Sequence, residues 1–217
     1  LNGYTPQRVS NHAVERFIAD TTDKATLVAT SWSDRGHSFY ALSSPLGTWV
    51  FDASTGFWHE RKSYGADRWR VSCVERFGSA LIAGHYDSST LYTMSPAVYA
   101  EGNDPIQWEI RPAAVHAHPS RMVLHRVDVD VVPGVGLNSS ATQDAAPVLM
   151  IDSSEDGGDT FGGERSVALG TINQKLTTVS AHRFGLIRPT GRGLRFRCSA
   201  DVIRGLVGAS LTMERLQ

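Results

Sequence analysis

The fold is decided by the stretch Gly36-His-Ser-Phe-Tyr-Ala-Leu-Ser-Ser-Pro-Leu-Gly-Thr-Trp-Val-Phe-Asp-Ala-Ser-Thr-Gly-Phe-Trp-His-Glu-Arg61. Three short runs rich in aromatic and β-branched residues are separated by clusters of glycine, proline and serine, which is typical of consecutive antiparallel strands. In the middle run Trp49 and Phe51 alternate with Thr48, Val50 and Asp52, because successive strand side chains point to opposite faces. The stretch therefore predicts a three-stranded meander, with its aromatic side chains in the core.

The neighbouring sequence extends this pattern. Residues 26–32 read Thr-Leu-Val-Ala-Thr-Ser-Trp and predict one more strand, which makes four, the number in a β-propeller blade. The pattern begins again over 69–111, where Gly84-His85 repeats Gly36-His37 and Trp108 repeats Trp58. Both repeats are separated by roughly 50 residues, which is the period of propeller repeats. A run of alternating valines and aspartates over 121–132 starts the last group of strands.

We therefore predict an all-β, β-propeller-like protein of four-stranded antiparallel blades, with one short N-terminal helix. Blade-like units are expected at about 26–61, 69–111 and 121–217, in one domain over 1–217 or the C-terminal portion of one. The helix is expected over His12–Ile18, with Ser10 or Asn11 as its cap. The side chains expected to be buried are Phe39, Trp49, Phe51, Leu81, Ile82 and Tyr92.

Composition narrows the function classes. The chain has 217 residues, of which 41% are hydrophobic and 20% charged, as in a folded globular protein. The net charge of −1 gives no electrostatic argument for binding nucleic acid or a membrane. No apolar run approaches the ~20 residues of a membrane-spanning helix. Cys73 and Cys198 lie in strand-like runs and are interpreted as two small buried side chains, without a disulfide.

One motif predicts a structural turn. Residues 154–161 read Ser-Glu-Asp-Gly-Gly-Asp-Thr-Phe and resemble the Asp-box of sialidase-like propellers. The residues of this turn motif are Ser154, Asp156, Gly158, Thr160 and Phe161. Its chemistry is side-chain bonding to the local backbone, which stabilises a hairpin and catalyses nothing. The run also resembles the start of a calcium loop, but the position of the bidentate glutamate holds Gly163, so no metal site is expected.

Two further clusters have the residue types of a binding site. The first comprises His116, His118, His125, Asp128 and Asp130, which are types that bind metals. No third ligand is fixed beside the His-Ala-His pair, so these residues are interpreted as surface groups. The second comprises Arg192, Arg195, Arg197 and Arg204, with Arg188 nearby. It suits a phosphate backbone or an acidic partner, but a solvated strand face is the favoured interpretation.

The sequence contains no phosphate-binding loop, nucleophile elbow or zinc-protease motif. We therefore expect no catalytic centre, no cofactor and no metal. A sialidase-like propeller that binds or cleaves glycans stays open as an alternative function, and so does a kelch-like protein interaction module.

Several segments together resemble one family, the tail hub or packaged-DNA stabilisation proteins of short-tailed bacteriophages. The segments that carry the resemblance are Gly3–Glu15, Gly36–Tyr40, Thr48–Arg61, Ser153–Phe161 and Ala168–Gly185. The family is roughly twice this length, so the resemblance implies that this is the C-terminal part. The chain begins with Leu1 instead of Met, which agrees with that expectation.

The resemblance implies a structural role in the virion. The family closes the neck of a filled capsid and retains the packaged DNA. Its members join the portal and adaptor proteins to the tail needle and tailspikes, as a ring of six copies. The implied location is the virion tail, after synthesis in the host bacterial cytoplasm, with no sequence-specific nucleic acid or membrane partner. The resemblance assigns no binding residues. For this part of the protein alone we expect a monomer or a weak oligomer.

Overall fold

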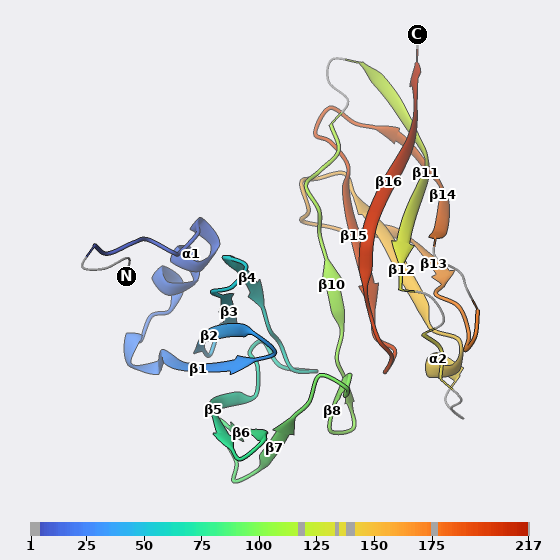
Figure 1. The fold of residues 1–217 in the computed structure, drawn as a ribbon. Coiled ribbons are helices and arrows are strands. Elements are labelled where there is room, and N and C mark those ends of the chain that lie inside the picture. The colour runs from blue at the N-terminus through green and yellow to red at the C-terminus, as the bar shows by residue number, and fades with distance from the viewer. Residues whose placement is uncertain (1–4, 117–119, 133–134, 138–141, 175–177, 217) are drawn as a thin grey trace. The chain divides into compact units, whose positions relative to one another are not determined.

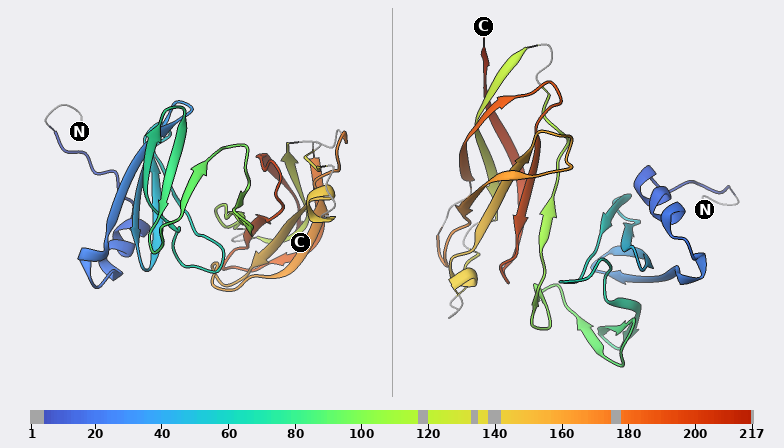
Figure 2. Two further views of the ribbon diagram at one scale, coloured as in Figure 1. Left: turned by 90° about the horizontal axis from the view of Figure 1, so that it is seen from below. Right: turned by 180° about the vertical axis from the view of Figure 1, so that it is seen from behind.

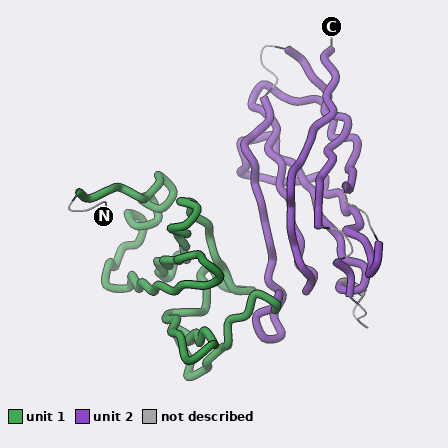
Figure 3. The backbone as a smooth tube through the Cα atoms, viewed as in Figure 1, with its two compact units in different colours: residues 1–98 green, residues 99–217 purple. Residues whose placement is uncertain are grey.

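The computed structural model describes residues 5–116, 120–132, 135–137, 142–174 and 178–216 (Figure 1). The sequence predicts one domain, whereas the chain divides into two compact units, residues 1–98 and 99–217 (Figure 3). Strands dominate both units and the only α-helix longer than one turn among the described residues is near the N-terminus, so the predicted all-β class is confirmed.

The first unit begins with the predicted helix. Helix α1 spans His12–Asp20, and the Asn11 side chain accepts the backbone N–H of Val14 at 2.9 Å as its N-cap. An asparagine suits this position because its side-chain oxygen satisfies an N–H that has no partner within the helix. Val14 and Phe17 are three residues apart, so they lie on one face of the helix, and both are buried. Tertiary packing of this face supports the short helix. A 3₁₀ turn follows at Lys24–Thr26.

Two antiparallel sheets complete the first unit. The first sheet has the order β1-β2-β3-β4 and the second the order β5-β6-β7. The strands are β1 (Val28–Asp34), β2 (His37–Ser44), β3 (Gly47–Asp52), β4 (Phe57–Glu60), β5 (Val71–Phe77), β6 (Ala80–His85) and β7 (Leu91–Met94). The four strands predicted over 26–61 thus form one sheet, as expected. Strand β5 is bonded to β1, where the Val74 N–H donates to the Thr30 hydroxyl at 3.0 Å.

The buried face of β3 is the opposite of the predicted one. Thr48, Val50 and Asp52 are buried, whereas Trp49 and Phe51 are half-buried. Val50 is fully buried in a core that also holds Trp32 and Trp69, and these two rings fill the space on that side. Of the other predicted core residues, Leu81 is buried, while Phe39, Ile82 and Tyr92 are half-buried.

The second unit is a sandwich of two sheets that face each other (Figures 1 and 2). One sheet has the order β10-β15-β12-β13 and the other the order β14-β11-β16, and all neighbours are antiparallel. The strands are β10 (Trp108–Ile110), β11 (Arg121–Val131), β12 (Val148–Ser154), β13 (Gly162–Ala168), β14 (Thr178–Ile187), β15 (Gly193–Cys198) and β16 (Leu206–Leu216). The second unit also contains two short strands that precede β10, β8 (Ala100–Glu101) and β9 (Asp104–Pro105), and a one-turn helix between β11 and β12, α2 (Thr142–Ala145).

The core of the sandwich follows from strand alternation. Leu124, Val127 and Val129 of β11 are fully buried and face Ile151 of β12 and Phe196 of β15 in one cluster. The outward neighbours on β11, Asp128 and Asp130, bond instead to Ser180 and Thr178 on β14. The alternation predicted over 121–132 is therefore confirmed, with an interruption at His125, which has no counterpart on β16.

The described residues form no closed propeller, so this part of the prediction needs correction. The strand expected to complete the unit at 69–111 is β10, which pairs with β15 of the sandwich, with Trp108 opposite Cys198. Trp108 packs against the sandwich core, and that apolar contact explains its pairing. The region 121–217 is accordingly part of a two-sheet sandwich and not a blade.

The cysteines behave differently from each other. Cys198 is buried as predicted, and burial raises the pKa of its thiol. Cys73 is exposed, contrary to the prediction, and both cysteines are free. Among the residues that the structure describes, none forms a helix long and apolar enough to cross a membrane.

Candidate functional site

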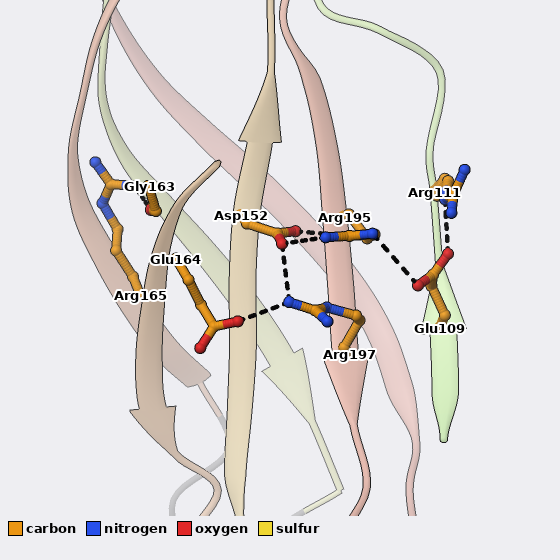
Figure 4. Close-up of polar contacts among 8 residues, drawn as sticks. All are labelled: Glu109, Arg111, Asp152, Gly163, Glu164, Arg165, Arg195 and Arg197. Atoms are coloured by element: carbon orange, nitrogen blue, oxygen red, sulfur yellow. Dashed lines mark hydrogen bonds and ion pairs between the residues drawn. The ribbon is translucent and has the colours of Figure 1, made fainter. Parts of the chain in front are cut away.

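A charged network covers the outer face of the sheet that contains β12 and β15 (Figure 4). On β15, Leu194, Phe196 and Cys198 point into the core, so Arg195 and Arg197 point outward. Asp152 lies directly opposite Arg195 on β12. Residues opposite each other in an antiparallel pair share one face, which brings the carboxylate to both guanidinium groups.

The contacts within this network are short and partly bidentate. Asp152 Oδ1 accepts Arg195 Nε at 2.9 Å, and Oδ2 accepts Arg195 Nη2 at 2.5 Å. Arg197 Nη2 donates to the same Oδ2 at 2.9 Å and to Glu164 Oε2 at 2.6 Å. Paired bonds between arginine and carboxylate fix direction as well as charge. Asp152 therefore ties two strands together, and Arg197 extends the network to β13.

The network reaches the other edge of the sheet through Glu109 on β10. Arg195 Nη1 lies 3.9 Å from Glu109 Oε2, and Arg111 Nε lies 2.6 Å from Glu109 Oε1. With Glu164, the network joins three carboxylates to three guanidinium groups across all four strands. Its formal charges cancel, so it offers no net charge to a polyanion.

Burial makes the charge of Asp152 dependent on its partners. The residue is 2% exposed, and its side chain is covered by the two arginines. Burial is the largest influence and raises the pKa of this carboxyl, but the hydrogen bonds and charges of Arg195 and Arg197 outweigh it, so the pKa is lowered. In return, the hydrogen bond from Asp152 is the main cause that raises the pKa of Arg195. Both groups stay ionised at neutral pH, as a structural ion pair requires.

The other arginines of the predicted basic cluster bind the chain itself. Arg192 is 4% exposed and donates to the backbone carbonyls of Phe184 and Leu186 and to Glu155 Oε1. Arg204 donates to the carbonyls of Tyr99 and Ile106. Arg192 and Arg204 therefore do not belong to a solvated face, whereas Arg195 and Arg197 lie on the outer face of the sheet but are paired with carboxylates. Asp152 was not recognised from the sequence as the partner of Arg195 and Arg197. The signal for it was an acidic residue directly after the apolar strand run Val-Leu-Met-Ile.

The turn between β12 and β13 contains the predicted motif. Ser154 Oγ accepts the Gly158 N–H at 2.8 Å and donates to Asp156 Oδ1 at 2.6 Å, and the Asp156 carboxylate accepts the Thr160 N–H at 3.0 Å. These bonds, led by the one from Ser154, hold the pKa of Asp156 well below its usual range. The aromatic ring of Phe161 lies 4.2 Å from the Arg195 guanidinium, so the turn contacts the charged network.

Arg165 connects β13 to the opposite sheet. Its Nε donates to the His182 carbonyl at 2.7 Å and its Nη2 to the Arg183 carbonyl at 2.5 Å. Its guanidinium also lies over the Phe184 ring, 4.2 Å from the centroid. This side chain therefore closes one side of the sandwich, between β13 and β14.

The histidine and aspartate residues that resembled a metal site do not converge. His125 Nε2 lies 2.9 Å from Glu214 Oε2, Asp130 accepts the Thr178 hydroxyl at 2.6 Å, and His116 lies against Gly191. His118 is outside the described residues. The described residues contain no group of three or more histidine, cysteine or acidic side chains placed to hold a metal ion.

The first unit contains a histidine–aspartate pair that the sequence did not single out. His37 Nδ1 lies 2.7 Å from Asp52 Oδ2, and Asp52 also accepts the Ser54 N–H and the Thr55 hydroxyl. The Ser54 hydroxyl donates to the Gly36 carbonyl and not to the imidazole, so the group lacks the geometry of a catalytic triad. Its bonds hold the turn between β3 and β4 against the start of β2, beside the turn between β1 and β2.

A comparison with protein families identifies a relative of the second unit. Residues 107–214 match a family described as bacteriophage P22 Gp10, beta-sandwich, and this match covers just under half of the chain. It begins one residue before β10 and ends within β16, so it coincides with the sandwich in the structure. No curated protein matches the chain. In its second unit, therefore, the chain is similar to the β-sandwich of a bacteriophage protein family.

Proposed function

We propose that the chain is a structural protein of a phage tail. The observation that carries the proposal is the coincidence between the phage family match over residues 107–214 and the sandwich of the second unit. The segments that resemble tail hub proteins lie in both units, from the N-terminal helix to β14. The family match in the second unit and the resembling segments in both units thus favour the same class of protein.

The polar chemistry of the chain supports a structural role. Asp152, Arg195 and Arg197 bond to one another across strands, and Asp156 is occupied by the bonds of its own turn. A catalytic acid or base must instead reach a substrate proton. The chain is accordingly proposed to act through its rigid shape, without a reaction of its own.

The finer proposal is that of a tail hub. The full-length protein would form a ring of six copies that joins the portal and adaptor proteins to the tail needle and tailspikes, and would retain the packaged DNA. Stable interfaces of standard size bury ~1,600 Å² in total, so contacts of this kind need surfaces on several strands or loops. The proposed location is the tail of the virion.

Reconstitution of particles tests this role. DNA-filled heads that lack the protein are mixed with the full-length protein, and released DNA is measured by its sensitivity to nuclease. A matched control carries Asp152→Lys, which places a cation between Arg195 and Arg197 and should disrupt the sandwich. We expect the unaltered protein to bind and protect the DNA, and the variant to fail. Heads that still leak with protein bound would refute DNA retention, and heads that bind no protein would refute the tail assignment.

The propeller-based alternatives lose their structural basis. A sialidase-like enzyme and a kelch-like module were both considered because of an expected propeller, and the described residues form no closed one. The turn motif at 154–161 occurs here between two strands of the sandwich. We therefore do not propose either function.

A further inference from the structure

An open hollow lies on the sheet β14-β11-β16, on the side of the second unit that the charged network does not occupy. It is lined by His125, His182 and Arg183. Ala181 points into the core, so its neighbour His182 points outward, on the same side as Ser180. The proposed structural role does not explain why two histidines and one arginine share this hollow.

Two backbone irregularities place these side chains together. Between the pairs Leu124–Gly185 and Arg126–His182, His125 of β11 lies opposite two residues of β14, Arg183 and Phe184, so β14 is bulged there. Against β16, His125 itself is the extra residue. Bulges redirect side chains and are frequent beside functional sites. On the facing strand Arg183 has a φ of +66°, which a residue with a Cβ adopts only at a conformational cost. Both irregularities occur at the same level of the sheet.

The strained residue is held in place by its surroundings. Arg165 donates to the carbonyls of His182 and Arg183 and so fixes the peptide units on both sides of the Arg183 Cα. Strain of this kind persists where neighbouring contacts impose it, and it clusters at functional sites. Arg35 also has a positive φ, of 49°, but it precedes Gly36 in the two-residue hairpin between β1 and β2, where the turn itself requires it. Arg183 lies in the bulge of β14 opposite His125, where glycine would be free of this strain.

The charge of the hollow is only partly compensated. Among the residues that the structure describes, none forms an ion pair or hydrogen bond with the Arg183 guanidinium. His125 is bonded to Glu214 at 2.9 Å, and Asp128 is occupied by Arg126 at 2.8 Å and by Ser180. The hollow is lined by His125, His182 and Arg183. The charged or titratable groups next to these residues or in contact with them are Arg126 and Asp128 of β11, Glu214 of β16 and Arg165 of β13.

We propose that His125, His182 and Arg183 bind an oxyanion of the phosphate type. Guanidinium and imidazolium groups are donors without acceptors, and they form strong hydrogen bonds with phosphate oxygens. The Arg183 guanidinium presents its N–H donors in a planar fork that matches phosphate oxygens, and the two imidazole rings add donors beside it. This site is additional to the proposed tail role and does not depend on it.

The test is a titration of the 217-residue chain with inorganic phosphate at pH 6, followed by NMR of the histidine ring protons. Arg183→Gly removes the guanidinium and relieves the strain at once, so the variant should fold at least as stably as the original chain. We expect it to bind phosphate roughly tenfold more weakly, as for the loss of one charge-assisted hydrogen bond. Arg183→Lys should retain most of the affinity. Glu214→Gln should bind more tightly, because it removes the competing carboxylate beside His125.

Arg35→Gly is the matched control, since it removes one arginine and relieves one positive φ outside the hollow. It should bind phosphate as the original chain does. Equal binding by Arg183→Gly, or equal weakening by Arg35→Gly, would overturn the site. A parallel titration with dimethyl phosphate distinguishes a free or terminal phosphate from a diester of nucleic acid or lipid. Weaker binding of the diester is expected, and binding as tight as that of phosphate would overturn the monoester assignment.

Discussion

Replacing Asp152 with asparagine tests the charged network most sharply. The change preserves the shape of the side chain but removes the charge that holds Arg195 and Arg197. Breaking a fully buried ion pair by removing one partner costs about 3–5 kcal/mol. The two arginine side chains are 18% and 21% exposed, and Arg197 keeps its 2.6 Å contact with Glu164, so the cost should be smaller. We expect the free energy of unfolding of the second unit to fall by about 2–3 kcal/mol. The equilibrium constant for unfolding should therefore rise roughly 30- to 150-fold.

Native-state hydrogen exchange with mass spectrometry suits this measurement, because it follows peptides of β12 and β15 separately from the first unit. Glu214→Gln is the control, since it makes the same chemical change at a side chain that is 67% exposed and paired with a half-exposed histidine. Exposed pairs contribute about 0–1 kcal/mol, so the control should stay close to the original chain. An Asp152→Asn effect no larger than that of the control would refute the conclusion that the network stabilises the sandwich.

The pH dependence of the same variant gives an independent check. Burial raises the pKa of Asp152, but the hydrogen bonds and charges of Arg195 and Arg197 outweigh it, so the pKa is lowered in the folded state. Its stabilising effect is therefore fully present above the unfolded pKa of about 3.9 and is lost as the pH falls through the folded value. The stability difference between the original chain and Asp152→Asn should be constant from pH 7 to about pH 5 and shrink below about pH 4. A difference that grows in acid would contradict this sign.

Three further predictions concern the helix, the core and the turn. Asn11→Ala should destabilise α1 by about 1 kcal/mol, because the hydrogen bond from the Val14 N–H is lost. Faster hydrogen exchange over His12–Asp20 would show this effect, and unchanged exchange would contradict the role of Asn11 as the N-cap. Phe196→Ala should lower the free energy of unfolding of the second unit by about 3–5 kcal/mol, because the ring is 1% exposed and its loss leaves a cavity in the core. Urea unfolding followed by hydrogen exchange measures this loss. A loss below about 1 kcal/mol would contradict the placement of Phe196 in the core. A chelator should leave the melting temperature unchanged, since Asp156 is satisfied by the bonds of its turn; a decrease of several degrees would reveal a bound cation, which stabilises by mass action.

Local sequence predicted the first sheet well. Strands β1 to β4 are joined by short turns such as Arg35-Gly36, so each strand pairs with its neighbour in the sequence. Alternation and turn residues suffice for that arrangement. They did not predict which face of β3 is buried, because this depends on the Trp69 ring, which comes from a segment outside the meander.

The sandwich and its network could not be derived in the same way. Strand β10 pairs with β15, whose residues lie far along the chain, and one sequence gives no signal for such a partner. The repeat of Trp58 by Trp108 suggested a second blade, although Trp108 packs in the sandwich. The arginines at alternate positions of β15 were recognised, but Asp152 and Glu164, which neutralise them, become their neighbours only through the strand pairing.

The most direct measurement of the proposed tail role is the protein composition of particles of a phage that carries the gene for this chain. Particles are purified, tails are separated from heads, and peptides of the chain are quantified by mass spectrometry against those of the portal protein. A structural tail protein should be found in the tail fraction, in several copies per particle and in a fixed ratio to the portal. Its absence from purified particles, with the protein present in infected cells, would contradict the proposed role.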